Sequence, residues 1–368
     1  MFTVRHCVYV LFAILAVGSL GCDENTPPEG PDAPPQINLV TISGMPSDDV
    51  YDVLVDSKNR LWVSTEEGVL MWENAQASSF NVDNATWFSD RNGIPNLRCR
   101  GLAELNKKIF VATWGGGIGI GDSLAIYDPL AQWEAVTPSD GLPVGRVGEL
   151  AADDSSIWLA TVEGVFQYID DPLLEVEDRI VDHSGNDEFG AGVFSSILVY
   201  DSDTRGPEVW TTEKRRDVLG IFVPGGIKVR HPTETQYFRT ATSGIPSDDV
   251  NDIAFDDQRG VFWSAHVLNG IASLDVDTKT WTHIGTGDGL VSDVVSSVAV
   301  NNLATPWAKG TVWVATQNGL TKMEPDGDMV NYTDGSGLPN LRVRKVVVDK
   351  NNNVWLGFVE RGAARVSP

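Results

Sequence analysis

The chain has 368 residues, with 51 acidic against 27 basic side chains and a formal net charge of −24. This balance argues strongly against nucleic acid or anionic lipid as a direct partner, because phosphate binding rests on a basic surface. The 36 glycines, 12 tryptophans and 42% hydrophobic residues are typical of a turn-rich β protein with a substantial core, and not of a disordered chain.

Residues 1–21 are predicted to be a signal peptide. The eleven apolar residues from Cys7 to Val17 are too few to span a bilayer as a mature helix, and they suit the apolar core of a signal. The Gly21-Cys22 junction resembles a bacterial lipoprotein signal, which implies that Cys22 is the lipidated first residue of the mature chain. The alternative is an ordinary signal peptidase site with Cys22 left free. The lipoprotein interpretation predicts a lipid-anchored protein of the bacterial cell envelope, facing the periplasm or the cell surface.

Residues 22–35 are predicted to be an extended tether, since the segment is rich in proline and has no apolar period. With Cys7 removed and Cys22 acylated, only Cys99 remains, so no intramolecular disulfide is expected. Cys99 lies in an apolar strand and is predicted to be a small core residue.

The remainder, residues 36–368, contains a repeat. Each copy has a Gly-Leu-Pro-like turn, an apolar strand and an aromatic residue that opens a Val-Ala-Thr-like segment. The aromatic positions, spaced 42 to 53 residues apart, are Trp62, Phe110, Trp158, Trp210, Trp263, Trp313 and Trp355. Self-similarity at a fixed period of this size indicates a propeller or a solenoid.

Each repeat is predicted to form four short strands, and the fifth copy shows this most clearly. Its predicted strands are Val250–Phe255, Val261–Ala265, Ile271–Leu274 and Trp281–Ile284, separated by Gly, Asn and Asp turns. Four antiparallel strands per repeat, arranged radially, predict an all-β, seven-bladed β-propeller.

Closure of the ring is predicted to involve the N-terminal strand. The last repeat supplies only three strands, the third being Ala363–Val366, whereas an extra strand, Ile37–Ile42, precedes the first repeat. The sequence therefore predicts that Ile37–Ile42 pairs with Ala363–Val366 and completes the seventh blade.

The Gly-Leu-Pro-x-x-x-Val turn followed by Trp-Val-Ala-Thr resembles the two-component regulator propeller repeat. This repeat occurs in extracytoplasmic sensor regions of bacterial hybrid histidine kinases, and the resemblance covers residues 36–368. It implies a stand-alone sensing module. It also implies that the Gly-Leu-Pro loops and the turns after Val-Ala-Thr share a ligand face, around a channel lined by the first strand of each blade.

Five arginines fall on the predicted channel mouth. The fifth residue after the turn glycine is Arg98, Arg146 or Arg342 in three repeats, and Arg100 and Arg344 follow two residues later. The same later position holds Tyr51, Gly148, Asn251 and Ser296 in four other repeats. One interpretation is a site for a carboxylate, sulfate or phosphate group, because guanidinium groups pair with such anions in a bidentate manner. The alternative is salt bridging between blades, to Asp49, Glu149 and neighbouring acids.

The threonine that ends Val-Ala-Thr is predicted to satisfy local backbone groups, and three repeats replace it, by Glu213, His266 and Phe358. These replacements, together with Trp114 one position later in the second repeat, are candidates for ligand contact. Glu213 and His266 come from adjacent repeats and are also a candidate acid–base pair. The histidines show no metal-ligand spacing, so no metal and no cofactor is predicted.

The resulting hypothesis is a non-enzymatic, lipid-anchored envelope propeller that binds a small anionic ligand or glycan, or a protein of the envelope. Two alternatives stay open. One is a propeller lyase or hydrolase with its site at the channel mouth, and the other is a structural subunit of an envelope complex.

Overall fold

The computed structural model describes residues 34–123, 132–142, 145–185, 188–202, 206–232 and 234–367. Residues 34–368 form one unit by their contacts. Residues 1–33 lie outside the described residues, so the predicted signal peptide (1–21), the lipidation of Cys22 and the predicted tether (22–35) stay predictions. Within the described part, no helix is long and apolar enough to cross a membrane.

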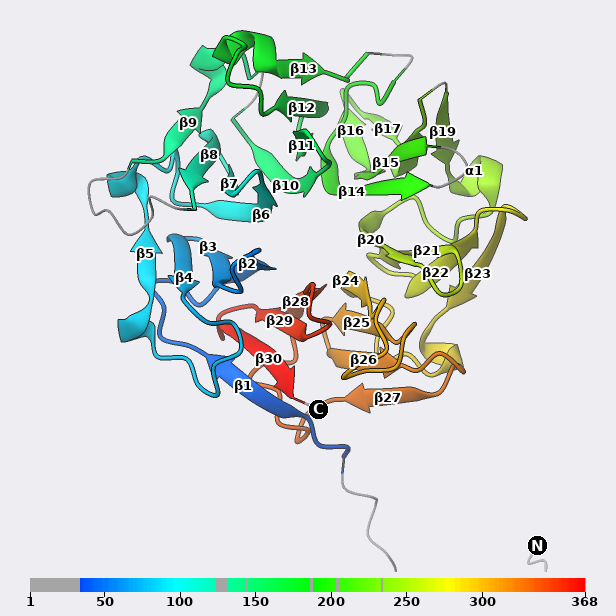
Figure 1. Ribbon diagram of the computed structural model, residues 1–368. Helices are drawn as coiled ribbons and strands as arrows, with labels where there is room; N and C mark the ends of the chain where they lie inside the picture. Colours follow the sequence, from blue (N-terminus) through cyan, green and yellow to red (C-terminus); the bar gives the residue numbers. More distant parts are fainter. Residues whose placement is uncertain are drawn as a thin grey trace, which may run out of the picture. The chain divides into compact units, whose positions relative to one another are not determined.

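The described residues form seven four-stranded antiparallel sheets arranged as a ring (Figure 1). In six sheets the first strand in chain order lies at the centre of the ring and the later strands follow outward. In the seventh, β28 is innermost and the N-terminal strand β1 is outermost. This confirms the all-β, seven-bladed propeller, and the strands of the fifth blade agree with the predicted bounds to within one residue at each end.

Within each blade the strands follow one another from the innermost outward. Blade 1 holds β2 (Val50–Val55), β3 (Leu61–Thr65), β4 (Gly68–Trp72) and β5 (Thr86–Phe88); blade 2 holds β6 (Cys99–Leu105), β7 (Lys108–Thr113), β8 (Gly117–Asp122) and β9 (Glu134–Val136). Blade 3 holds β10 (Val147–Ala152), β11 (Ser156–Thr161), β12 (Val165–Ile169) and β13 (Ile180–Asp182); blade 4 holds β14 (Phe194–Ser202), β15 (Gly206–Glu213), β18 (Gly226–Arg230) and β19 (Thr235–Phe238). Blade 5 holds β20 (Val250–Asp256), β21 (Val261–His266), β22 (Ile271–Asp275) and β23 (Thr280–Ile284); blade 6 holds β24 (Val295–Val300), β25 (Val312–Thr316), β26 (Gly319–Met323) and β27 (Met329–Tyr332). Blade 7 holds β28 (Val343–Val348), β29 (Val354–Phe358), β30 (Ala363–Ser367) and β1 (Asn38–Ile42).

Two kinds of element lie outside the blades. A small hairpin, β16 (Arg216–Val218) and β17 (Ile221–Val223), is inserted between β15 and β18. The helical segments are single turns in connections, namely Val82–Asn84, Asp90–Asn92, Pro138–Asp140, Val176–Arg179, Thr286–Asp288 and α1 (Thr240–Ser243).

The repeated aromatic residue is the centre of each blade's packing. It lies on the second strand, is at most 4% exposed in every blade, and is covered on both sides because neighbouring blades pack face to face. In most blades its indole N–H donates to an acid or amide near the connection between first and second strands, as Trp62 does to Asp56 and Trp355 to Asp349, both at 3.0 Å. This bond satisfies the buried indole and fixes the connection.

The ring closes as predicted. β1 pairs antiparallel with β30, with Leu39 opposite Val366 and Ile42 opposite Ala363. The chain turns toward this pair at Gly362, where a side chain would collide with the carbonyl oxygen of Ile42. Residues 34–368 therefore contain every blade and both strands of the closing pair.

We expect deletion of residues 36–43 to lower the melting temperature by on the order of 10 °C, or to prevent folding, because it removes the closing strand and exposes the edge of β30. Thermal unfolding followed by circular dichroism measures this. Attaching the same residues behind Pro368 through a short turn restores an antiparallel partner for β30, and should recover stability. An unchanged melting temperature in the deletion variant would contradict closure by β1.

Candidate functional site

Every innermost strand carries a β-bulge near its start. In blade 1, Val50 pairs with Thr65 and Asp52 with Ser64, so Tyr51 is an extra residue in the ladder. The same shift occurs in β6, β10, β14, β20, β24 and β28. A bulge interrupts the alternation of side chains, so two consecutive residues of one strand can face the channel. The channel entrance consequently has two layers of side chains.

The upper layer surrounds a cavity of about 340 Å³ at the channel mouth. Its wall is made by residues at the bulges and by two residues that follow second strands. The bulge residues are Tyr51, Arg100, Gly148, Ser195, Asn251, Ser296 and Arg344, and the other two are Trp114 and Lys214. The cavity lies at the end of the innermost strands that the Gly-Leu-Pro loops enter. Of the positions that the repeat spacing singled out, those that line it are Tyr51, Arg100, Gly148, Asn251, Ser296 and Arg344.

Tyr51 is held between two guanidinium groups. The guanidinium carbons of Arg100 and Arg344 lie 3.6 and 4.0 Å from the centre of its ring. The Tyr51 hydroxyl and Arg100 Nη2 donate to Oε1 of Glu66, at 2.6 and 2.8 Å, and Arg344 Nη2 donates to Asp49 at 2.8 Å. The arginines therefore form salt bridges between blades, as the structural interpretation of the sequence predicted, while their side chains also line the cavity.

This cluster shifts the ionisation of its members. Burial, and the hydrogen bond to Glu66, raise the pKa of Tyr51. Burial alone would raise the pKa of Glu66, but the bonds from Tyr51 and Arg100 hold it below its ordinary value. The arginines thus face an ionised carboxylate on one side and the cavity on the other.

Lys214 closes the opposite side of the cavity. Its Nζ donates to the carbonyl oxygen of Val250 at 2.7 Å and to the side-chain oxygen of Asn251. Burial lowers the pKa of Lys214 to about 8, since the ammonium form is poorly solvated there. Trp114 lies on the blade 2 side, with its ring 5.7 Å from the guanidinium carbon of Arg100.

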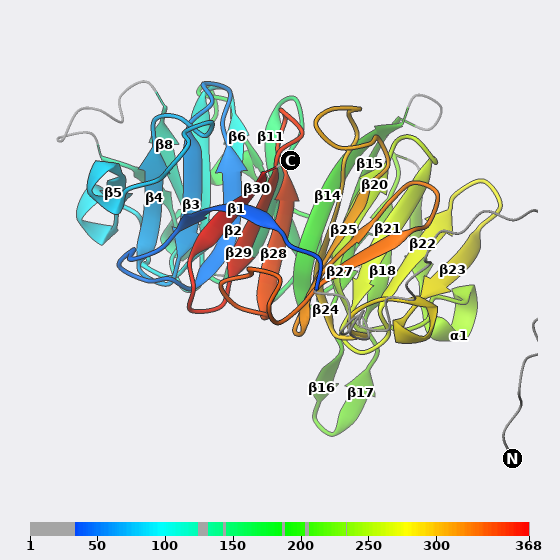
Figure 2. The ribbon, with the colours of Figure 1, turned by 90° about the horizontal axis from the view of Figure 1, so that it is seen from below.

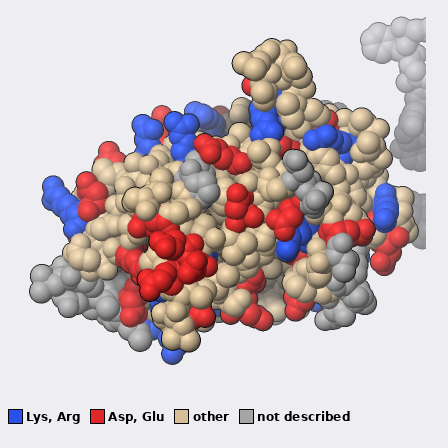
Figure 3. Space-filling view, turned by 90° about the horizontal axis from the view of Figure 1, so that it is seen from above, with Lys and Arg blue, Asp and Glu red and all other residues tan. Residues whose placement is uncertain are grey.

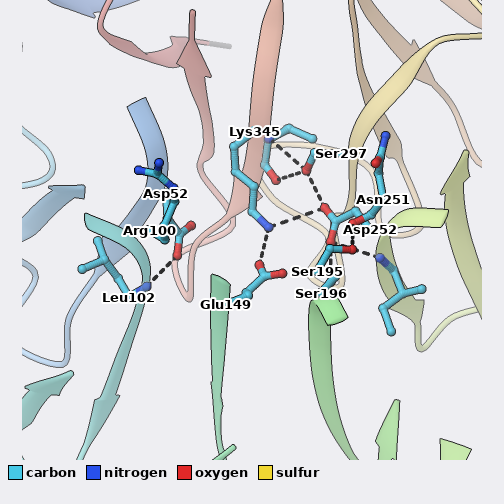
Figure 4. Close-up of polar contacts among 12 residues, drawn as sticks. Asp52, Arg100, Leu102, Glu149, Ser195, Ser196, Asn251, Asp252, Ser297 and Lys345 are labelled. Atoms are coloured by element: carbon cyan, nitrogen blue, oxygen red, sulfur yellow. Dashed lines mark hydrogen bonds and ion pairs between the residues drawn. The ribbon is translucent and has the colours of Figure 1, made fainter. Parts of the chain in front are cut away.

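The lower layer is a narrow band of charged side chains that we call the waist. It consists of Asp52 and Asp252, which are buried, and Glu149 and Lys345, which are mostly buried. Figure 4 shows Lys345 reaching from β28 toward Glu149 and Asp252, with Nζ distances of 2.5 and 3.5 Å to their oxygens. Asp252 also accepts from the hydroxyls of Ser196 and Ser297, and Asp52 accepts from the backbone N–H groups of Val53 and Leu102. Lys345 therefore pairs directly with two of the three carboxylates and attracts the third, Asp52, over a longer distance.

This imbalance determines the protonation of the waist. Burial raises the pKa of Glu149 to about 7 and also raises that of Asp52, because desolvation opposes the ionised form. The pKa of Lys345 is raised as well, since the attraction of the three acids exceeds the effect of its burial. Lys345 therefore stays cationic, whereas Glu149 and Asp52 bind a proton at a higher pH than exposed carboxyl groups do.

Below the waist the channel widens into a second hollow of about 480 Å³. It is lined largely by apolar residues from the later part of the innermost strands, including Leu54, Leu102, Leu150, Leu198, Phe255 and Val347. The waist thus separates a charged mouth from an apolar hollow.

The predicted ligand residues occupy different environments. Arg100, Arg344 and Trp114 line the mouth cavity, whereas Arg98, Arg146 and Arg342 are exposed on the rim and are not part of its wall. Arg98 also lies 3.4 Å from Glu66. The role of each residue in ligand binding stays a prediction.

Glu213 and His266 are buried within their own blades and do not line the mouth cavity. Glu213 accepts from the Tyr237 hydroxyl and lies 3.2 Å from Lys228 Nζ. His266 contacts the Ser264 hydroxyl at 3.0 Å, and burial lowers its pKa to about 3. Where threonine is retained, as in Thr65, its hydroxyl donates to the glycine carbonyl at the start of the next strand, at 2.9 Å.

The waist and Lys214 did not stand out from the repeat pattern. Each waist residue is a charged side chain within a mostly apolar strand, as in Val-Tyr-Asp-Val-Leu-Val and Val-Arg-Lys-Val-Val-Val. A charge in a predicted central strand is the signal that identifies them. Lys214 follows Glu213 directly, at the position equivalent to Trp114.

A family model described as a two component regulator propeller matches residues 44–67, which cover the first turn and the first two strands of blade 1. The predicted resemblance to that repeat is confirmed. No protein of curated function matches the sequence closely enough to indicate a relationship.

Several solved structures share the fold at low identity. An extracellular domain of a hybrid two component system from B. thetaiotaomicron has 14% identity and a TM-score of 0.61, over 90% of this chain and 39% of that one. Virginiamycin B lyase from Staphylococcus aureus has 12% identity and a TM-score of 0.61, over 90% and 98%. PorZ, a surface component of the type-IX secretion system of Porphyromonas gingivalis, has 14% identity and a TM-score of 0.61, over 88% and 47%. The chain spans about two fifths of the first of these, and identities this low show the fold alone.

We expect the Glu149→Gln variant to flatten the pH dependence of stability between pH 4.5 and about 7. The folded-state pKa of Glu149 lies above its ordinary value of 4.5, so its contribution to stability is complete below pH 4.5 and is lost as the pH rises through about 7. Urea unfolding across this range measures the slope. A slope identical to that of the unsubstituted protein would contradict the raised pKa.

Proposed function

We propose that the chain is a non-enzymatic, ligand-binding module of the bacterial cell envelope, held to a membrane by lipid on Cys22. Its ligand is a small acidic saccharide, bearing a carboxylate or sulfate group, that binds in the cavity at the channel mouth. The repeat type and the extracellular sensor domains of similar fold support a sensing role.

One observation carries this proposal: cationic side chains from three blades converge on one cavity. Arg100 comes from blade 2, Lys214 from blade 4 and Arg344 from blade 7. Nη1 of Arg344 is buried and has no hydrogen-bond partner among the described residues, so one donor is left for a ligand. A volume of about 340 Å³ lies within the range of small-molecule sites.

The rest of the cavity suits the sugar part of such a ligand. The acids of the waist, Asp52, Glu149 and Asp252, form its floor and offer acceptors for hydroxyl groups. Trp114 adds aromatic surface to the wall, and Asn251 adds an amide. A ligand whose anionic group lies near the arginines, and whose hydroxyl groups point toward the waist, would form favourable contacts with both layers of side chains.

The contacts of the candidate acid–base pair favour binding over catalysis. The Glu213 carboxylate is engaged by Tyr237 and Lys228, and His266, with its lowered pKa, is neutral near pH 7. A general acid or base must reach a substrate proton, and both side chains lie away from the mouth cavity. The proposed function therefore assigns them a structural role.

We expect Arg344→Gln to weaken binding of an acidic saccharide about tenfold or more, because it removes a charge-assisted contact. A thermal-shift panel of uronic acids, sulfated sugars and their neutral counterparts identifies the ligand, and calorimetry gives its affinity. The salt bridge that is lost is partly exposed, so the cost to stability should stay within about 1 kcal/mol.

Arg342→Gln is the matched control, since Arg342 lies two residues away on the exposed rim. It should bind the ligand as the unsubstituted protein does. An equal loss of ligand affinity in both variants would contradict an anion site at the channel mouth. So would a panel in which no acidic sugar raises the melting temperature.

We expect Cys22→Ser to release the protein from the membrane fraction of an expressing bacterium, because the thiol is the site of lipid attachment. Cell fractionation and the mass of the purified chain measure this, with Cys99→Ser as the control that keeps the anchor. The lipid anchor would be contradicted if the Cys22→Ser protein stayed in the membrane fraction and its mass differed from that of the unsubstituted protein only by the substitution.

A further inference from the structure

The hairpin β16–β17 projects from the ring on the side of the channel mouth (Figure 2). It replaces the turn between the second and third strands of blade 4, at the place where the other six blades have short connections. Its strands pair only with each other among the described residues, so the body of the propeller does not cover it.

The tip of this hairpin is apolar and exposed. Val218, Leu219, Ile221 and Phe222 are 44%, 99%, 69% and 67% exposed, and they are four of the eight large apolar side chains exposed in the described part of the chain. Val218 lies opposite Ile221 on one face of the hairpin, whereas Phe222 lies opposite Asp217 on the other. Apolar side chains therefore lie on both faces of the tip, and the exposed Asp217 lies beside Phe222.

Leu219 occupies a position where leucine is unfavourable. Leu219 and Gly220 both have positive φ values, of 55° and 81°. Such two-residue turns strongly prefer Asn-Gly, because a bulky side chain is strained in the left-handed region. Since Leu219 is almost fully exposed, no contact within the described chain offsets this strain.

Basic side chains lie at the root of the hairpin. Arg215 is exposed with its guanidinium 5.6 Å from the Phe222 ring, and Arg216 donates to the carbonyl oxygen of Ala191 at 2.6 Å. Figure 3 shows basic side chains along the edge from which this knob projects, while acidic ones gather on the flank. Two acids accompany these basic groups: Asp217, which is exposed on β16, and Glu213 at the root, which is buried beside Arg216.

We propose that β16–β17 contacts a phospholipid bilayer, with its apolar tip in the interfacial region and Arg215 at the level of the phosphate groups. A narrow knob whose tip carries apolar side chains on both faces suits a fluid surface that can surround it. Four side chains bury far less than the roughly 1,200 Å² of a stable protein interface, which disfavours a second protein as the occupant. Six residues from Lys214 to Leu219 span about 16 Å, so the channel mouth stays clear of the membrane.

The test uses residues 34–368, which hold the complete ring and lack the proposed lipid site. Flotation with phosphatidylcholine vesicles, and with equal parts phosphatidylethanolamine and phosphatidylglycerol, measures binding. We expect Leu219→Asn combined with Phe222→Thr to reduce the partition coefficient at least tenfold, since each methylene removed from the interface costs about fourfold. Leu219→Asn restores the preferred turn residue, so the variant should remain folded.

Leu303→Asn is the matched control, because this exposed leucine lies on the opposite face, in the connection between β24 and β25. It should float as the unsubstituted protein does. A Leu219→Cys protein carrying an environment-sensitive dye reports insertion directly, because Cys99 is buried and burial raises its thiol pKa to about 12.

Failure of the unsubstituted propeller to float with either vesicle would overturn the proposal. Equal flotation of the hairpin variant, or a dye that remains in water, would do the same. Loss of a dimer in the hairpin variant by sedimentation, without vesicle binding by the unsubstituted protein, would show that the tip contacts a second copy instead.

Discussion

In a regular β-strand, successive side chains point to opposite faces, so only every second residue of an innermost strand would reach the channel. The bulge near the start of each innermost strand removes this restriction at one point, and it recurs in all seven blades of the described ring. It places Tyr51 and Asp52, or Arg344 and Lys345, on the channel together. The cationic mouth and the acidic waist below it both depend on that local irregularity.

The two layers differ in solvation, and therefore in what they are able to do. Arg100 and Arg344 remain partly exposed and are paired with Glu66 and Asp49. In the waist, by contrast, desolvation makes it energetically unfavourable for all three carboxyl groups around Lys345 to be ionised. Protonation of one of these acids removes a buried charge and lowers that free-energy cost. A ligand that fills the mouth would consequently meet fixed positive charge above and groups of variable protonation beneath.

The sequence was sufficient to predict the ring, because hydrophobic periodicity and turn residues repeat in each blade and strand pairing follows from them. The same spacing from the turn glycine placed Arg100, Arg344, Asn251 and Ser296 on the mouth. The repeat spacing did not identify Asp52, Glu149, Asp252 and Lys345. If side chains alternated regularly along the strand, the residue after Tyr51 or Arg344 would point away from the channel. No residue within a single repeat predicts the bulge that changes this. Glu213 and His266 stood out as departures from threonine, but that position lies in a buried turn where the hydroxyl bonds to the backbone. A departure from the consensus there changes packing within the blade and does not reach the mouth.

Lys214 connects the channel mouth with the inserted hairpin. It directly follows β15 at the root of the insertion, while its ammonium group is bound by Val250 and Asn251 in the cavity wall. Next to it Glu213, surrounded by Lys228, Arg216 and Arg239, fixes the other side of the root. Because the pKa of Lys214 is lowered to about 8 by burial, an anion bound beside it would favour the charged form and raise that pKa. Ligand binding and proton uptake would then be linked at Lys214, the residue that leads from β15 into the hairpin.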